Sequence, residues 1–152
     1  METNNILKQL RENRNWTQEE LAERVLVTRQ AVSRWETGET QPNTDTLRLL
    51  SKVFDVSINT LLGSPRTLVC QCCGMPLSDD GLISREPDGS FQEDYCKWCY
   101  ADGKFAYPTM DSLLDFLVAH MPDPANRPEE DRRREYAFYL SELKHWKRPA
   151  EG

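Results

Sequence analysis

Apolar residues recur at helical spacing through the first sixty residues and again near the C-terminus, whereas the middle of the chain lacks this period. Ile6, Leu7 and Leu10 predict an amphipathic helix that fades by Asn15. Four further short helices are expected before about Ser64, each beginning at a residue type that favours helix starts. The first part of the chain is therefore predicted to be a bundle of five short helices.

Capping residues indicate where these helices begin and end. Thr17 and Glu20 have the spacing of a capping box, in which the Thr hydroxyl accepts a backbone N–H of the first turn and the Glu side chain accepts the backbone N–H of the Thr. Thr28 is expected to cap a third helix that stops at Gly38. The remaining starts are Pro42-Asn43-Thr44 and Ser57.

The rest of the chain has a different character. All five cysteines lie between residues 67 and 108 among turn-forming residues, which predicts loops and small hairpins. Helical spacing returns from Asp111 to Met121, and Pro128 is expected to start a helix that continues toward Trp146. The fold class is mainly α. The expected domains are a helical bundle at 1–66, a cysteine-bearing ribbon at 67–108 and a helical tail at 109–152.

The net charge of −6 is unevenly distributed over the 152 residues. Residues 1–66 hold nine basic and nine acidic side chains, so the whole excess of acid lies in residues 67–152. A neutral domain can still bind DNA if its basic groups share one face, because phosphate charge is neutralised locally. No apolar run approaches the roughly 20 residues of a membrane span, and no signal peptide is visible, so a cytoplasmic protein without a membrane partner is expected.

The third predicted helix carries side chains that can read bases. Ala31, Val32 and Trp35 can face the bundle. The remaining surface is then shared by Arg29, Gln30, Ser33 and Arg34. Arginine can pair with guanine through two hydrogen bonds, and glutamine can do so with adenine. The alternative interpretation of these residues is a solvated helix face.

Two segments, Thr17-Gln-Glu-Glu-Leu-Ala-Glu-Arg-Val25 and Thr28-Arg-Gln-Ala-Val-Ser-Arg-Trp-Glu-Thr-Gly38, resemble the phage-repressor-like helix-turn-helix (XRE/Cro/C1) family. The resemblance covers about residues 3–63 and implies a bundle whose third helix enters the major groove. The implied DNA contacts are Gln18, Thr28, Arg29, Gln30, Ser33 and Arg34, with Asn43 as a weaker phosphate candidate. Of these, Gln18 and Thr28 are expected to hold phosphates at helix N-termini.

The same resemblance makes two structural statements. It implies a buried ion pair between Arg11 and Glu36 that holds the first helix against the third. This sequence also differs from the family pattern at one position, because it has Leu26 where the family usually has Gly or Asn in the turn. A branched residue is disfavoured in that conformation, so the turn is expected to differ slightly and to change the tilt of the third helix.

The cysteines form two Cys-x-x-Cys pairs, Cys70/Cys73 and Cys96/Cys99, with 22 residues between them. Two such pairs can supply four thiolates to one cation, the set that suits Zn²⁺. Cys72 has the wrong spacing and is interpreted as a free thiol. A reactive dithiol without metal is the alternative, and it explains the four cysteines less well.

Cys70-Gln-Cys-Cys-Gly-Met-Pro-Leu77, with Glu93-Asp-Tyr-Cys96 and Cys99-Tyr-x-x-Gly-Lys-Phe105, resembles a bacterial zinc-ribbon family. The resemblance extends through most of residues 70–147 and brings no known activity. A four-thiolate site leaves no open coordination position, so the zinc is expected to be structural, with a zinc- or redox-responsive switch as the alternative. His120 and His145 are expected to be surface or packing residues.

The C-terminal part is more apolar and aromatic than a free tail requires. Its aromatic and leucine side chains either cover the ribbon or form a dimer interface, and an effector pocket among them has no support. Arg132, Arg133 and Arg134 are interpreted as a solvated face that balances the acidic residues Glu129 to Asp131.

Together these patterns predict a homodimeric transcriptional regulator, a repressor that binds a palindromic site on double-stranded DNA. An antitoxin-like protein, whose C-terminal part binds a partner protein, is the rival hypothesis. An enzyme is not expected, because the sequence lacks an open metal site, a nucleophile–base pair and a phosphate loop.

Overall fold

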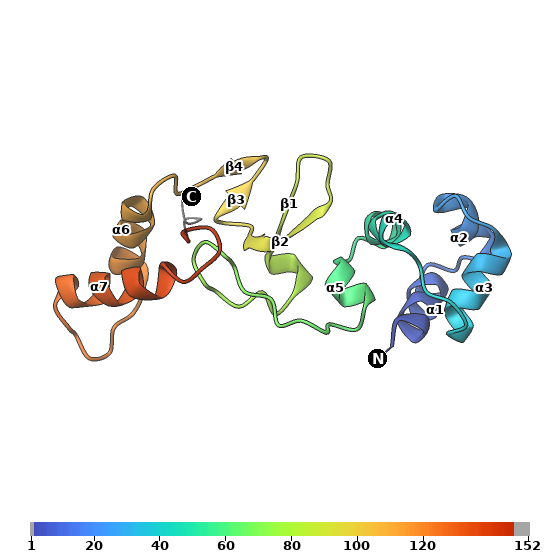
Figure 1. The fold of residues 1–152 in the computed structure, drawn as a ribbon, viewed down its shortest axis with the longest axis horizontal. Helices are drawn as coiled ribbons and strands as arrows, with labels where there is room; N and C mark the ends of the chain where they lie inside the picture. The colour runs from blue at the N-terminus through green and yellow to red at the C-terminus, as the bar shows by residue number, and fades with distance from the viewer. Residues whose placement is uncertain (1, 148–152) are drawn as a thin grey trace, which may run out of the picture. The chain divides into compact units, whose positions relative to one another are not determined.

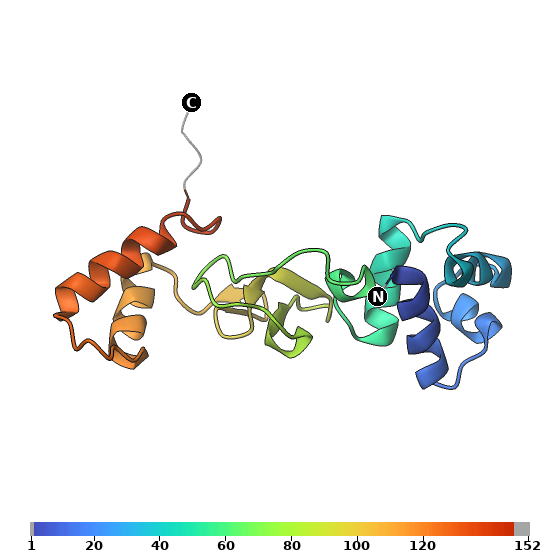
Figure 2. The ribbon, with the colours of Figure 1, turned by 90° about the horizontal axis from the view of Figure 1, so that it is seen from below.

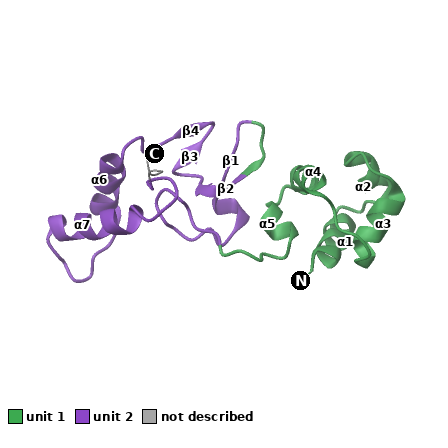
Figure 3. Ribbon diagram, viewed as in Figure 1, with its two compact units in different colours: residues 1–67, 88–91 green, residues 68–87, 92–152 purple. Residues whose placement is uncertain are grey.

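The computed structural model describes residues 2–147 of the chain. These residues fall into two compact units (Figures 1 and 3). Of the described residues, the first unit comprises 2–67 and 88–91, and the second comprises 68–87 and 92–147. The chain is mainly helical with small sheets, as its apolar pattern predicts. None of the helices within residues 2–147 has the length and apolar character needed to cross a bilayer.

Five helices form the first unit, as the sequence predicts. They are α1 (Thr3–Asn13), α2 (Gln18–Arg24), α3 (Arg29–Thr37), α4 (Thr44–Phe54) and α5 (Ile58–Leu61). One apolar stripe from each helix meets the others at the centre of the bundle. The core consists of the buried side chains Leu7, Leu21, Ala22, Val25, Val32, Trp35, Leu50, Phe54 and Leu61.

Side-chain caps start four of these helices. The side chains of Thr17, Thr28, Asn43 and Ser57 accept the backbone N–H three residues later, which confirms these starts. For α2 the structure gives only the Thr17 half of the predicted capping box. The complete box is instead at α6 (Met110–His120), where Thr109 and Ser112 each accept the other's backbone N–H.

The turn between α2 and α3 contradicts the expectation for Leu26. Its φ of 59° lies in the left-handed region that the family's Gly or Asn would adopt, so the turn keeps that conformation despite the leucine. The N–H of Val27 donates to the carbonyl of Ala22 at 2.9 Å, the closing hydrogen bond of a Schellman motif. Two well-packed helices hold this residue in place, and its side chain is 84% exposed. Leu26 therefore bears local strain with almost no burial to offset it.

Leu26→Asn is expected to stabilise the first unit by about 1 kcal/mol, because asparagine tolerates the left-handed region better than a branched residue. Chemical denaturation followed by circular dichroism measures this change. The matched control is Leu49→Asn, a partly exposed leucine inside α4, where no left-handed strain exists to relieve. A Leu26→Asn protein no more stable than the parent would contradict the strain assigned to this turn.

Small sheets and one helix pair build the second unit. A 3₁₀ turn, η1 (Asp80–Leu82), leads into β1 (Ile83–Arg85), which pairs with β2 (Phe91–Cys96). A second hairpin pairs β3 (Tyr100–Ala101) antiparallel with β4 (Lys104–Phe105), with Tyr100 opposite Phe105. Helix α6 then packs against α7 (Glu129–Leu140), and Figures 1 and 2 show the two side by side.

Helix α7 ends earlier than its apolar pattern predicts. The pattern indicates a helix toward Trp146, but the helix stops at Leu140 and residues 141–146 form turns. The reason is tertiary: the N–H groups of Lys144 and His145 donate to Gln71 in the ribbon rather than to helix carbonyls. Arg148 and the residues after it lie outside the described part of the chain.

The arginines of α7 bind α6 rather than balancing the acidic first turn of their own helix. Arg133 forms ion pairs with Asp111 at 3.1 Å and with Asp115 at 2.7 Å. Arg132 donates to the carbonyl oxygen of Val118 at 3.1 Å. The interpretation of Arg132 and Arg133 as a solvated face is therefore wrong, because the helix hairpin turns both toward α6. Arg134 remains exposed.

Candidate nucleic-acid interface and metal centre

Helix α3 has one buried face and one exposed face. Val32 and Trp35 are buried in the core of the first unit. On the opposite face, Arg29, Gln30 and Arg34 are exposed. Helical geometry thus separates the residues that hold α3 from those that can reach a ligand.

The two exposed arginines of α3 have no partner among the residues that the structure describes. Neither the Arg29 nor the Arg34 guanidinium donates a hydrogen bond or joins an ion pair there. Other arginines of this unit are engaged: Arg14 donates to the Phe54 carbonyl, and Arg24 stacks on the Trp16 ring with 4.1 Å to its centroid. Two guanidiniums that are exposed on one helix and lack such a partner are available to an anionic ligand.

The other predicted DNA contacts are in two kinds of position. Gln18 and Ser33 are half-buried, at the first residue of α2 and inside α3. Thr28 and Asn43 are exposed, but each uses its side-chain oxygen as a helix cap, toward Ala31 N at 3.1 Å and Thr46 N at 2.9 Å. Both caps leave the first-turn N–H groups of their helices at the surface, where phosphate oxygens can bind.

The buried ion pair implied by the helix-turn-helix resemblance is present. Arg11 donates from Nε and Nη2 to the two carboxylate oxygens of Glu36, both at 2.8 Å. The Arg11 side chain is 12% exposed and that of Glu36 is 4% exposed. The hydrogen bond to Glu36 raises the pKa of Arg11, so the pair stays ionised. A bidentate pair of this kind fixes the angle between α1 and α3 as well as their distance.

A tight turn carries the first cysteine pair. Gly74 N–H donates to the Cys70 carbonyl and Cys70 N–H to the Met75 carbonyl, both at 2.8 Å. The N–H of Cys73 points at the Cys70 sulfur, 3.5 Å away. Gly74 has a φ of +81°, and a Cβ there would lie 2.4 Å from the Tyr139 ring. Glycine is thus required by both the turn and its packing.

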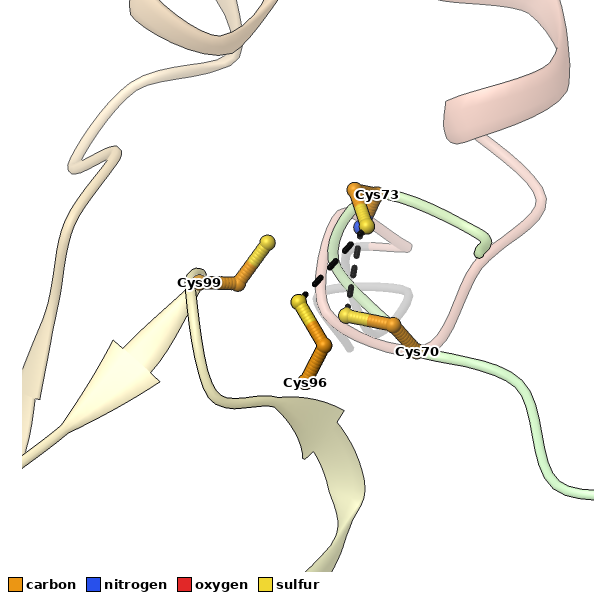
Figure 4. Close-up of side chains that lie close together, drawn as sticks. All are labelled: Cys70, Cys73, Cys96 and Cys99. Atoms are coloured by element: carbon orange, nitrogen blue, oxygen red, sulfur yellow. Dashed lines mark hydrogen bonds between the residues drawn. The ribbon is translucent and has the colours of Figure 1, made fainter. Parts of the chain in front are cut away.

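The second cysteine pair joins two strands. Cys96 ends β2 and Cys99 immediately precedes β3, so the turn between the strands directs both thiols to one side. The sulfurs of Cys70, Cys73, Cys96 and Cys99 all lie within 4.8 Å of one another, and Figure 4 shows them converging. The structure thus brings together the four cysteines that the sequence predicts as ligands of one metal ion.

The geometry of the four sulfurs fits a bound zinc ion. The Cys73 and Cys96 sulfurs are 3.9 Å apart. Tetrahedral Zn–S bonds of about 2.3 Å separate neighbouring sulfurs by about 3.8 Å. As thiols, the four groups compete for protons: the hydrogen bond with Cys73 lowers the pKa of Cys70, while hydrogen bonding with Cys70 raises the pKa of Cys99. A dication bound by four thiolates removes this conflict.

The fifth cysteine, Cys72, is fully buried and lies outside this set of four. Its backbone carbonyl accepts a hydrogen bond from Trp146 Nε1 at 2.7 Å. The structure thus agrees with the interpretation of Cys72 as a non-ligand thiol and shows that its side chain packs in the interior.

Sequence reasoning missed how the C-terminal segment attaches to the first cysteine pair. Lys144 N–H donates to Gln71 Oε1 at 3.0 Å, and its ammonium pairs with Asp94 at 2.9 Å. His145 lies in a cluster of rings with Tyr95 and Phe105, where burial lowers the pKa of its imidazole. The aromatic content of the tail indicated packing, and the structure identifies the ribbon as its target.

Two family models match this chain. The model described as "Putative zinc ribbon domain" matches residues 69–147, more than half of the chain, and a helix-turn-helix model matches residues 7–61. The ribbon match covers the four clustered cysteines together with α6, α7 and the attached C-terminal segment. The ribbon and the tail therefore belong to one family unit.

Individual relatives match parts of the chain. The HTH-type transcriptional activator BcrR from Enterococcus faecalis is 50% identical over 62 residues, which are 41% of this chain and 30% of that protein. The chain thus aligns with less than a third of this curated relative. Among solved structures, the P22 c2 repressor bound to synthetic operator 9T is 31% identical with a TM-score of 0.41, covering 42% of this chain and 97% of that one. ComR from Streptococcus suis is 14% identical with a TM-score of 0.38, covering 99% of this chain and 37% of that one.

The N-terminal match agrees with the five-helix bundle, its capped third helix and the Arg11–Glu36 pair. The C-terminal match agrees with the four converging sulfurs and the segment packed on them. The chain therefore belongs to the zinc ribbon domain family and carries an XRE-type helix-turn-helix domain in front of its ribbon.

Proposed function

We propose that this protein is a sequence-specific DNA-binding transcriptional regulator and that α3 is its recognition helix. The observation that carries the proposal is the exposed face of α3, where Arg29 and Arg34 have no partner among the described residues and Gln30 lies beside them. An exposed guanidinium without an intramolecular partner can pair with guanine without first breaking an ion pair. The named activity of BcrR, transcriptional activation, is of the same class.

We assign the predicted contacts two roles. Arg29, Gln30, Ser33 and Arg34 face the base edges. Gln18, Thr28 and Asn43 hold the backbone, because each lies at or next to the start of a helix, where N–H groups and the helix dipole favour phosphate. Backbone contacts of this kind set the register in which the α3 side chains meet the bases.

We propose that the four-cysteine site holds a structural Zn²⁺. Four thiolates complete a tetrahedral coordination sphere and leave no position for water or substrate. The surrounding contacts also suit a structural role, since the C-terminal segment donates to the carbonyls of Gln71 and Cys72, which lie between the first two cysteines of the site. We therefore assign the protein a binding role rather than a catalytic one, acting on DNA in the cytoplasm.

We further propose that the regulator acts as a homodimer on a palindromic site. Two copies related by a two-fold axis present two α3 helices to two half-sites, so the site inherits the symmetry of the protein. Repression remains the predicted sign of regulation. A promoter-fusion assay, with a DNA site selected from a random pool, decides between repression and activation. The activator BcrR shows that activation also occurs in a protein with a matching segment.

Selection of bound DNA from a random pool tests this function directly. We expect enrichment of one palindromic sequence with two equal half-sites. Enrichment of a single half-site would support recognition and contradict the dimer. A pool that shows no enriched sequence would contradict DNA recognition itself.

Arg29→Ala is expected to weaken binding to the selected site by about 1–3 kcal/mol and to relax the preference at one base step. Fluorescence anisotropy with the selected site and with all single-base variants measures both effects. Arg48→Ala is the matched control, because Arg48 is an exposed arginine on α4 outside the proposed interface. An equal loss of affinity for every sequence would make Arg29 a phosphate contact instead.

A further inference from the structure

Helix α7 presents a polar stripe with one large exposed aromatic residue. Asp131, Arg134, Glu135 and Phe138 lie at i, i+3, i+4 and i+7, which places them on one face. The Phe138 side chain is 75% exposed, far more than a core residue of this size. These four residues and Arg127 line a surface hollow of about 470 Å³.

We infer that this stripe pairs with the same stripe of a second copy, in an antiparallel arrangement about a two-fold axis. Four residues at this spacing form the kind of hole that receives one side chain from a facing helix. Phe138 from each copy would fill the hollow of the other. The stems of Arg127 and Arg134 would pack on its ring, an arrangement that guanidiniums favour.

The charges of the stripe are self-complementary about its midpoint. In an antiparallel pair centred between residues 134 and 135, Arg134 of each copy faces Glu135 of the other copy, so the two-fold axis gives two such contacts. The same axis places Phe138 opposite Asp131, both on α7. The one basic residue of the stripe thus meets an acidic residue of an identical chain, and the two-fold axis makes this contact twice.

The ion pairs already present within the chain are compatible with this arrangement. Arg127 contacts both Asp123 and Glu135. The Glu135 side chain is still 61% exposed and can accept from a second arginine, because a carboxylate has several acceptor positions. The opposite face of α7 is occupied by the Arg133 pairs to α6, which leaves the stripe as the outward face.

This inference deepens the proposed function, since it names the surface through which the regulator would form its dimer. Sedimentation velocity of the full chain without DNA tests it. We expect the parent to be a dimer, and Arg134→Glu or Glu135→Arg alone to weaken it roughly tenfold or more, because each creates two like-charge contacts. The double variant R134E/E135R exchanges the two charges and is expected to restore the dimer.

Two control variants match the chemistry of these changes outside the stripe. Phe116→Ala removes a partly exposed aromatic side chain of α6, and Arg48→Glu reverses an exposed charge on α4. Both are expected to keep the parent's dimer, whereas Phe138→Ala is expected to lose it. Circular dichroism checks that every variant keeps its helices.

A monomeric parent would overturn the inference, and so would a double variant as weak as the singles or a dimer unaffected by Phe138→Ala. Failure of the proposed function is recognised separately. If the stripe controls the dimer but selection enriches no DNA sequence, the interface stands and DNA recognition fails. If DNA is enriched but the stripe variants leave the dimer unchanged, recognition stands and this interface fails.

Discussion

Cys96→Ser is expected to abolish tight metal binding and to unfold the ribbon, the largest effect of any single substitution in this chain. Structural zinc contributes about 10–16 kcal/mol of apparent binding free energy in small zinc domains, more than the stability of a typical domain. The ribbon has few other sources of stability, since its strands are two to six residues long and its sheets have two strands each. Without the four-sulfur site, little holds these hairpins together.

Metal content by mass spectrometry and limited proteolysis measure this outcome. Cleavage is expected within the ribbon, and also after Leu140, because the C-terminal segment is anchored on Gln71 and Cys72 beside the site. The first unit is expected to remain helical, since its core contains no cysteine. Chelation of metal from the parent protein should reproduce the same cleavage pattern.

Cys72→Ala is the matched control for this experiment. Cys72 is buried like Cys70, Cys96 and Cys99 but lies outside the set of four sulfurs. We expect it to retain one metal ion per chain and to lose only the stability that a buried side chain supplies. A Cys72→Ala protein that loses its metal, with Cys96→Ser retaining it, would contradict the ligand assignment.

Glu36→Gln is expected to destabilise the first unit by about 3–5 kcal/mol, the second largest effect, because it leaves the buried Arg11 guanidinium without its counter-charge. Arg11 is buried between α1 and α3, and its guanidinium also donates to the Trp16 carbonyl at 2.6 Å. Urea denaturation of the full chain, followed by a helical signal, measures the loss.

The double variant Arg11→Met/Glu36→Leu separates the two sources of that loss. It removes both charges and keeps apolar volume, so it is expected to recover much of the stability. Its DNA affinity should stay below that of the parent if the bidentate pair orients α3, because an apolar contact fixes distance but not angle. A double variant with full affinity would show that the pair contributes stability alone.

Helix positions and caps were predictable because both depend on neighbours within about four residues. Thr28 and Ser57 start helices through hydrogen bonds to N–H groups three residues away, and such contacts are set by local sequence. The clustering of the four cysteines was predictable for a related reason. Two Cys-x-x-Cys turns each preorganise two thiols, and only one long-range contact is needed to bring them together.

The end of α7 and the conformation of Leu26 were not predictable from local pattern. Apolar spacing extends the helix toward Trp146, but hydrogen bonds to Gln71 stop it at Leu140. Leucine disfavours a φ of 59°, but the packing of α2 and α3 imposes it. In both places tertiary contacts outweigh a local preference of about 1–2 kcal/mol.

By itself, the sequence determined the five-helix bundle, the exposed face of α3 and the four thiols of the metal site, because periodicity, caps and spacing are local properties of the chain. Only the tertiary structure decided that the C-terminal segment anchors on the first cysteine pair, that Arg132 and Arg133 turn toward α6, and that Phe138 stays outside. These outcomes depend on contacts between residues up to 74 positions apart, and the sequence around each residue does not indicate such contacts.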